Sequence, residues 1–266
     1  MPTYTKPNYI YQANDTAYIG QTEEGGKVAL TIKNAPHVLI AGVTGSGKSV
    51  MMRALLTGLI ANSFPDETAI YILDPKRVDY IEYRNCPHIK DICTTDKAML
   101  LFLERINNLM DKRLAEMMKT GQKDLKQSAK MPRIYIFCDE LADLTGGLNK
   151  KMFNYYLIRL AQMGRAAGIH LVLATQRPSA AVLPCQLRDN IPCRISLKVM
   201  DKTAARMIGV EGAEELGYKG DAIIKLADGR TAHFQGYLSP DEAIIQHAIE
   251  QTKKPERMGL FKLLFA

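Results

Sequence analysis

The chain has 266 residues, of which 47% are hydrophobic and 24% are charged, and its 35 Lys and Arg exceed its 28 Asp and Glu by seven. This composition excludes a disordered or fibrous chain and supplies enough apolar residues for one large domain. No apolar run approaches the roughly 18–20 residues that a membrane-spanning helix needs, and the N-terminus has no apolar signal-peptide core. The positive surplus favours a polyanionic partner without naming one.

The cysteines are odd in number and form no CxxC pair, so the sequence indicates neither a disulfide framework nor a zinc site. They are Cys86, Cys93, Cys138, Cys185 and Cys193. We therefore expect a protein of the reducing cytoplasm.

The first elements along the chain are an irregular arm at residues 1–16 and a hairpin. Two short β-prone runs about Gly25-Gly26 predict the hairpin. Beyond it, short runs rich in Ile, Leu and Val predict strands that are buried on both faces. These runs are His37–Ala41, Ala69–Leu73, Arg133–Cys138, Ile169–Ala174 and Arg194–Val199.

Helical patterns separate these runs. They cover Lys48–Ala61, Asp96–Thr120 and Lys150–Ala167. Thr94 or Thr95 supplies a cap for the second helix, which ends at Gly121. The alternation of strands and helices predicts an α/β fold, with a mostly parallel sheet and helices on both of its faces.

The C-terminal part adds a strand pair about Asp228-Gly229 and a final helix. The pair is Ala222–Leu226 with Thr231–Gln235, and Ser239-Pro240-Asp241 begins a helix that runs to about Gln251. We expect an arm with a small β-hairpin extension at residues 1–33, one main domain at 34–252, and a tail at 253–266.

A strand, a glycine-rich loop and a helix follow one another at residues 37–61, and the loop matches G-x-x-x-x-G-K-[ST]. In that context a chance glycine-rich turn is a poor alternative. Backbone N–H groups of such a loop surround phosphate oxygens, and the helix N-terminus adds partial positive charge. We expect Lys48 to reach the β- and γ-phosphates of ATP and the Ser49 hydroxyl to join the Mg²⁺ shell. The predicted nucleotide-binding residues are Gly42, Val43, Thr44, Gly45, Ser46, Gly47, Lys48, Ser49 and Val50.

A second apolar run, Ile134–Cys138, ends in two adjacent acids, Asp139 and Glu140. Ligands bind at the carboxyl ends of buried strands in such sheets. We expect Asp139 to hold Mg²⁺ through water and Glu140 to orient or deprotonate the attacking water. A pair of helix-capping acids is the alternative, but it requires the phosphate loop to be a coincidence. The two acids favour hydrolysis of ATP over binding alone.

Four stretches match one known pattern in order. They are His37–Ser49, Ile72–Lys76, Cys138–Leu144 and Arg165–Ser179. They closely resemble the motor domain of the FtsK/SpoIIIE DNA translocases, in the wider HerA/FtsK group, and the likeness spans about Ala17 to Gly236. It implies a RecA-like P-loop NTPase that assembles as a homo-oligomeric ring, usually a hexamer, around double-stranded DNA and moves along it by ATP hydrolysis.

The resemblance also implies roles for two further catalytic residues. Gln176, at the end of the strand that contains Leu171–Ala174, is similar to the family's γ-phosphate sensor, and an exposed loop amide is the alternative. Arg165 matches a position that implies an arginine finger for the neighbouring subunit's site. A cation that complements the helix dipole is the alternative there, and Arg159 and Arg194 are rival fingers.

For DNA, the resemblance places the loops after the sensor strand, and the next helix, toward the central channel. The basic residues at the matching positions are Arg177, Arg188, Lys202 and Arg206. Phosphate contacts need only positioned positive charge, so each residue taken singly could equally be a solvated cation.

Two other basic segments have plainer interpretations. Met110–Arg133 contains seven Lys or Arg against three acids, and we interpret it as an exposed helix end and loop in preference to a DNA contact. The tail Lys253–Ala266 combines positive charge with apolar residues that could dock on a subunit, a partner or a membrane surface. A packed C-terminal segment is the simpler interpretation of the tail.

Large members of the family add an N-terminal membrane segment, a long linker and a C-terminal winged helix, and none of these fits this sequence. About 30 residues follow the last matched motif, too few for a winged helix. We expect a stand-alone DNA translocase for DNA transfer, segregation or packaging by a mobile element or phage, whose recruiting protein or membrane complex the sequence does not identify.

Two other functions compete with this one. A protein-secretion ATPase of the same superfamily is disfavoured because such motors commonly string several ATPase modules in one chain. A small-molecule phosphotransferase is contradicted by Asp139-Glu140 and by the match beyond the nucleotide site.

Overall fold

The computed structural model describes residues 16–31, 34–77, 79–121, 123, 131–145, 147–217, 219–238 and 240–253. The predicted arm at 1–16, the polar stretch at 121–130 and the tail at 253–266 fall almost entirely outside these residues. In the part of the chain that is described, no helix has the length and apolar character to cross a membrane.

The described strands join in one sheet. They are β1 (Ala17–Gln21), β2 (Lys27–Leu30), β3 (Val38–Ala41), β4 (Thr68–Leu73), β5 (Ile89–Cys93), β6 (Arg133–Cys138), β7 (Ile169–Thr175), β8 (Cys193–Leu197), β9 (Asp221–Lys225) and β10 (Thr231–Gly236). Their order across the sheet is β2-β1-β10-β9-β8-β3-β7-β6-β4-β5. The strands from β8 to β5 in this order pair in parallel, and β9, β10, β1 and β2 continue the sheet with antiparallel pairs.

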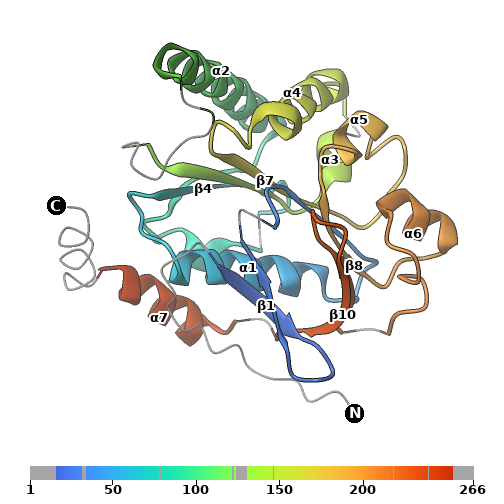
Figure 1. The fold of residues 1–266 in the computed structure, drawn as a ribbon. Helices are drawn as coiled ribbons and strands as arrows, with labels where there is room; N and C mark the ends of the chain where they lie inside the picture. The colour runs from blue at the N-terminus through green and yellow to red at the C-terminus, as the bar shows by residue number, and fades with distance from the viewer. Residues whose placement is uncertain are drawn as a thin grey trace.

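Helices cover both faces of this sheet (Figure 1). One face carries α1 (Lys48–Ala61), the short 3₁₀ helix η1 (Ile81–Tyr83) and α7 (Glu242–Lys253). The other carries α2 (Asp96–Thr120), α3 (Leu141–Thr145), α4 (Lys150–Met163), α5 (Cys185–Arg188) and α6 (Lys202–Ile208). In β3, Ile40 packs into the first apolar layer and Leu39 into the second, which explains why the strand is apolar throughout.

The predicted α/β fold, with a mostly parallel sheet and helices on both faces, is confirmed. Thr95 caps α2 through its side chain, which accepts a hydrogen bond from the Ala98 N–H, and Gly121 ends that helix in the left-handed region. The predicted helix from Lys150 ends earlier than expected, at Met163. The chain turns there toward β7 through Gly168, whose φ of 68° suits glycine.

Two features of the sheet were not predicted. Strand β5 has exposed Lys90 and Asp91 at its centre, so it lacks the apolar pattern of the buried strands, and it is tolerated because it lies at the sheet edge. The N-terminal hairpin is not a separate layer: β1 pairs with β10 through Gly20 and Gly236 and so extends the main sheet.

Three buried histidines make the stability of this fold dependent on pH. Burial, as the largest cause, lowers the pKa of His37 to about 3 and those of His88 and His170 to about 4, from an ordinary value of 6.5. His37 Nδ1 accepts from the Leu171 N–H, whereas His88 Nε2 and His170 Nδ1 donate to the carbonyl oxygens of Ser63 and Pro36 at 3.1 and 2.8 Å. A proton on these rings is therefore bound more weakly in the folded chain than in the unfolded one.

We predict that the free energy of unfolding falls as pH drops below about 6.5. These histidines then bind protons in the unfolded chain but remain neutral in the folded chain. Each histidine contributes up to about 1.4 kcal/mol per pH unit until its folded pKa is reached. Urea unfolding at pH 7.5, 6.5 and 5.5 measures this. His170→Gln should show a shallower dependence than the wild type; an identical dependence would contradict the assignment.

Candidate nucleotide-binding site

The glycine-rich loop follows β3 at the carboxyl ends of the parallel strands. Strand β3 lies between β7 and β8, and both neighbours hold the loop: the Gly42 N–H donates to the Thr175 carbonyl at 3.2 Å, and the Val43 N–H to the Lys198 carbonyl at 2.9 Å. Gly47 has a φ of 106°, and a Cβ there would lie 2.9 Å from the Gly220 nitrogen. Only glycine fits that position without a shift of the backbone.

The turn before β9 lies against the phosphate loop. The Gly220 N–H donates to the Ser46 carbonyl at 2.8 Å, and the Gly236 N–H donates to the Gly220 carbonyl at 2.7 Å. These contacts fix the ends of β9 and β10 against the loop. The antiparallel part of the sheet thereby becomes one wall of the site.

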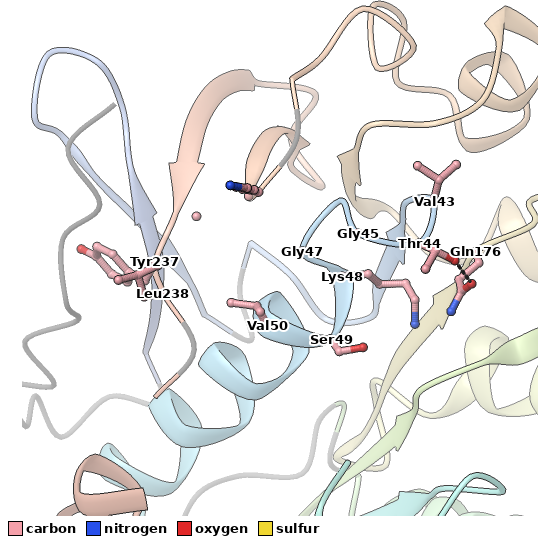
Figure 2. A pocket seen from close by; sticks show the side chains of 13 residues that line it. Val43, Thr44, Gly45, Gly47, Lys48, Ser49, Val50, Gln176, Tyr237 and Leu238 are labelled. Carbon is pink, nitrogen blue, oxygen red and sulfur yellow. Dashed lines mark hydrogen bonds between the residues drawn. The ribbon is translucent and has the colours of Figure 1, made fainter. Parts of the chain in front are cut away.

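A pocket of about 670 Å³ lies between the phosphate loop and this wall. Lys48, Ser49 and Gln176 line one part of it, and Tyr237 and Leu238 line another; in Figure 2 Gln176 and Tyr237 lie at opposite ends, with Val50 between them. The volume is in the range of small-molecule and cofactor sites. A polar end beside a helix N-terminus and an apolar end with an aromatic ring suit the triphosphate and the base of a nucleotide respectively.

Asp139 lies at the carboxyl end of β6 and is in contact with Lys48. The Lys48 ammonium donates to the Asp139 main-chain carbonyl at 2.6 Å and lies 3.5 Å from Oδ1 of its carboxylate. Lys76, in the loop after β4, forms a second ion pair with Oδ2 at 3.3 Å, and the Tyr80 hydroxyl donates to Oδ1 at 3.4 Å. Burial, and next the charge of Asp139, raise the pKa of Tyr80 well above its ordinary value, so this hydroxyl keeps its proton.

Glu140 is buried beside the end of β7. Its Oε1 accepts from the Thr175 hydroxyl at 2.9 Å, and its Oε2 accepts from the Gln176 N–H at 3.1 Å. The Gln176 side chain points toward the phosphate loop, where its Oε1 accepts from the Thr44 hydroxyl at 2.9 Å (Figure 2). The predicted base and the predicted γ-phosphate sensor thus lie side by side, with Gln176 lining the polar end of the pocket and Glu140 buried behind it.

The side chains at this end fit Mg²⁺. Ser49 lines the pocket in the first turn of α1, and the buried Asp139 carboxylate lies next to it behind Lys48, 3.5 Å from the Lys48 ammonium. Mg²⁺ prefers such oxygen ligands and is commonly bound by one or two of them together with substrate phosphates. Within the described residues, no group of three or more His, Cys, Asp or Glu side chains is placed to hold a metal ion.

Arg165 lies far from the pocket of its own chain. It is exposed in the turn before β7, whereas Gln176 follows the other end of that strand. A strand of this length spans roughly 20 Å at about 3.3 Å per residue. Arg165 therefore does not reach its own nucleotide site, and a role as a finger requires a second subunit.

The two rival arginines are held by contacts within the chain. Arg194 donates to the carbonyl oxygens of Ile191, Ile208 and Arg188 at 3.0–3.2 Å, and so ties α5 and α6 to β8. Arg159 pairs with Asp111 at 2.8 Å and joins α4 to α2. These contacts leave Arg165 as the better candidate of the three.

The residues expected at DNA lie on the segment from the end of β7 to α6. Arg177 is exposed next to Gln176. Lys202 and Arg206 are exposed four residues apart on α6 and so share a helix face. Arg188 contacts the Met207 sulfur at 3.2 Å, which brings it close to that helix, and it also pairs with Asp189. Their contact with DNA stays a prediction.

Several pocket residues escaped the sequence analysis. Lys219, Tyr237 and Leu238 line the pocket, and Lys76 and Tyr80 contact Asp139. One of the matched stretches, Ile72–Lys76, contains Lys76, but the match assigned no role to that residue. Packing of β9 and β10 against the phosphate loop brings Lys219, Tyr237 and Leu238 to the site, and pairing of β4 with β6 brings Lys76 and Tyr80 to Asp139.

Comparison with known proteins gives a consistent result. The model of the FtsK/SpoIIIE family matches residues 12–133 and 124–180. The DNA translocase FtsK of Staphylococcus epidermidis is 33% identical over 256 residues, and the DNA translocase SpoIIIE of Bacillus subtilis is 33% identical over the same length. Each match covers 88% of this chain and 32% of the relative, so the chain spans about a third of the length of these relatives.

Among solved structures, the pCW3 conjugation coupling protein TcpA with ATPγS is 28% identical, with a TM-score of 0.82 over 96% of this chain and 75% of that one. The cytoplasmic domain of the type VII secretion ATPase EccC of Thermomonospora curvata is 23% identical, with a TM-score of 0.75 over 93% of this chain and 32% of that one. The second likeness shows a shared P-loop ATPase fold alone. Because the family match extends over well more than half of the sequence and the relatives align with most of it, this chain belongs to the FtsK/SpoIIIE family.

Proposed function

We propose that this chain is an ATP-driven motor that moves double-stranded DNA and works in the cytoplasm as a homo-oligomeric ring, with a hexamer as the expected size. The observation that carries the proposal is the polar end of the pocket, where the phosphate-loop lysine, two strand-end acids and Gln176 converge. The names of the relatives, DNA translocases and a conjugation coupling protein, support DNA as the substrate.

The residues of the pocket suggest how ATP is bound and hydrolysed. Backbone N–H groups of the phosphate loop and the N-terminus of α1 hold the phosphates, and the Lys48 ammonium moves from Asp139 toward the β- and γ-phosphates. Ser49 and Asp139 would hold Mg²⁺, which when bound would supply positive charge that offsets charge on the phosphates. Glu140 takes the proton of the attacking water, and the amide of Gln176 donates to the terminal phosphate.

We predict that Lys48→Ala lowers kcat/KM for ATP by at least about a hundredfold, because the phosphates lose a positioned cation. Phosphate release and equilibrium binding of ATPγS measure the effect. Lys97→Ala removes an exposed lysine from the first turn of α2 and serves as the matched control, with wild-type turnover expected. Wild-type turnover of ATP by Lys48→Ala would show that the phosphate loop is not the catalytic ATP site.

Hydrolysis in the proposed ring needs two subunits. Arg165 lies before the amino end of the central strand β7, whereas its own pocket lies at the carboxyl end, so we expect it to supply positive charge to the transferred phosphoryl group of a neighbour. The finger and the catalytic acid of one active site then belong to different chains.

Arg165→Ala and Glu140→Ala should therefore each lose hydrolysis while keeping ATP binding. Mixing them should restore part of the activity, because some sites then combine an intact Glu140 with an intact Arg165 from the neighbour. Phosphate release across mixing ratios measures this. Mixtures no more active than the separate variants would sink the trans role of Arg165.

DNA is proposed to lie along Arg177, Arg188, Lys202 and Arg206. Duplex DNA at low salt should stimulate hydrolysis, and Lys202→Gln with Arg206→Gln should weaken DNA binding and reduce its salt slope by about two, since two phosphate contacts are lost. Fluorescence anisotropy over a salt series measures both quantities.

The paired substitution Lys112→Gln with Lys119→Gln is the matched control. It removes two exposed lysines of α2 from the other basic segment of the chain. An equal loss of DNA affinity in this control would indicate that α2, and not α6, contacts DNA. Absence of any stimulation by duplex DNA would reject DNA as the substrate and leave a secretion ATPase as the better function.

A further inference from the structure

The carboxylate of Asp139 is almost completely buried, and a Mg²⁺ ion could bind to it only after its surroundings rearrange. It is 1% exposed, and both of its oxygens already have partners. Oδ1 lies 3.5 Å from the Lys48 ammonium and 3.4 Å from the Tyr80 hydroxyl, and Oδ2 lies 3.3 Å from the Lys76 ammonium. A divalent cation bound through this carboxylate, directly or through water, needs one of these oxygens. Lys48 leaves Oδ1 when it turns to the phosphates, so the ammonium that still competes with a divalent cation for this carboxylate is that of Lys76 at Oδ2.

Among these partners, Lys76 is the one that can move into solvent. Lys48 is 4% exposed and can turn only toward the phosphates within the pocket, and Tyr80 is 1% exposed, whereas the Lys76 side chain is 38% exposed. The backbone beneath Lys76 is fixed, because Asp74 Oδ1 accepts from the N–H groups of Lys76 and Arg77 at 3.1 and 3.0 Å. The loop therefore fixes the backbone of Lys76 beside Asp139, while the partly exposed side chain can change its conformation.

The charges around Lys76 explain why it stays near the acids. Partial burial disfavours its charge, but the carboxylates of Asp139, Glu140 and Asp143 overcome this cost and raise the pKa of Lys76 above its ordinary value. A divalent cation at Asp139 would cancel that attraction. It would also repel the ammonium, since two like charges a few ångströms apart in a partly buried site interact unfavourably.

We propose that Lys76 is a displaceable counter-ion of Asp139, which competes with Mg²⁺ for the Oδ2 side of the carboxylate and leaves when the Mg²⁺ nucleotide binds. The inference rests on the proposed function, because it assumes that the pocket takes a nucleotide with Mg²⁺. It makes Lys76 a positioning residue: it holds the Asp139 carboxylate and sets how strongly Mg²⁺ contributes to nucleotide affinity.

The test measures the coupling between Mg²⁺ and nucleotide. The Kd for ATPγS is determined by isothermal titration calorimetry in excess Mg²⁺ and in EDTA, and the ratio of the EDTA value to the Mg²⁺ value is compared between chains. Lys76→Gln should raise this ratio about threefold to tenfold, because Mg²⁺ no longer displaces a cation. Lys76→Ala should act in the same direction. Arg77→Gln, which removes the next charge in the same loop, should leave the ratio within twofold of the wild type.

A double variant separates an effect through Asp139 from a general charge effect. In an Asp139→Asn background, where Oδ2 is lost as a charged ligand, Lys76→Gln should leave the ratio unchanged. An increase equal to that in the wild-type background would show that Lys76 acts through another group and would overturn the proposal. An unchanged or lowered ratio for Lys76→Gln in the wild-type background would overturn it as well.

The outcomes also distinguish this inference from the proposed function. If the wild type binds ATPγS more tightly with Mg²⁺ and only the Lys76 variants fail to change the ratio, the counter-ion role alone is wrong. If the wild type binds no ATPγS in either condition, the nucleotide site itself is wrong, and this inference falls with it.

Discussion

The contact between Lys48 and Asp139 joins the first turn of α1 to the end of β6, and the rest of the site is arranged around it. Both side chains are almost fully buried, so each charge needs the other to offset the cost of leaving water. The parallel order of β3, β7 and β6 makes the contact possible, because it sets the carboxyl ends of these strands at one edge of the sheet. Glu140 follows directly in the chain and is held against β7 by Thr175.

The antiparallel part of the sheet completes the pocket. Through Gly220 it touches the phosphate loop, and through Tyr237 and Leu238 it supplies the apolar end. The N-terminal hairpin pairs with β10 and so supports this wall from outside. The pocket therefore depends on segments from both ends of the described chain, and a core of parallel strands alone would leave it without its apolar end.

The parts of the site that the sequence predicted are those in which local pattern and chemistry coincide. The glycine-rich loop after β3 and the paired acids after β6 each combine a strand end with residues of one chemical role. Lys76 and Lys219 gave no such signal, because an isolated lysine in a loop is usually a solvated charge. Their proximity to the pocket results from long-range packing: Lys76 reaches Asp139 across 63 residues. Strand β5 escaped for a related reason, since its exposed Lys90 and Asp91 break the apolar pattern.

The central claim is that this chain converts ATP hydrolysis into movement of DNA through a ring. The structure of the full chain bound to ATPγS, Mg²⁺ and duplex DNA, determined by electron cryomicroscopy, tests it most directly. We expect a closed ring with DNA in its channel against Lys202 and Arg206, phosphates at Lys48, and Arg165 of one subunit directed at the terminal phosphate of the next. A nucleotide bound away from the phosphate loop, or a particle without DNA in a channel, would contradict the account.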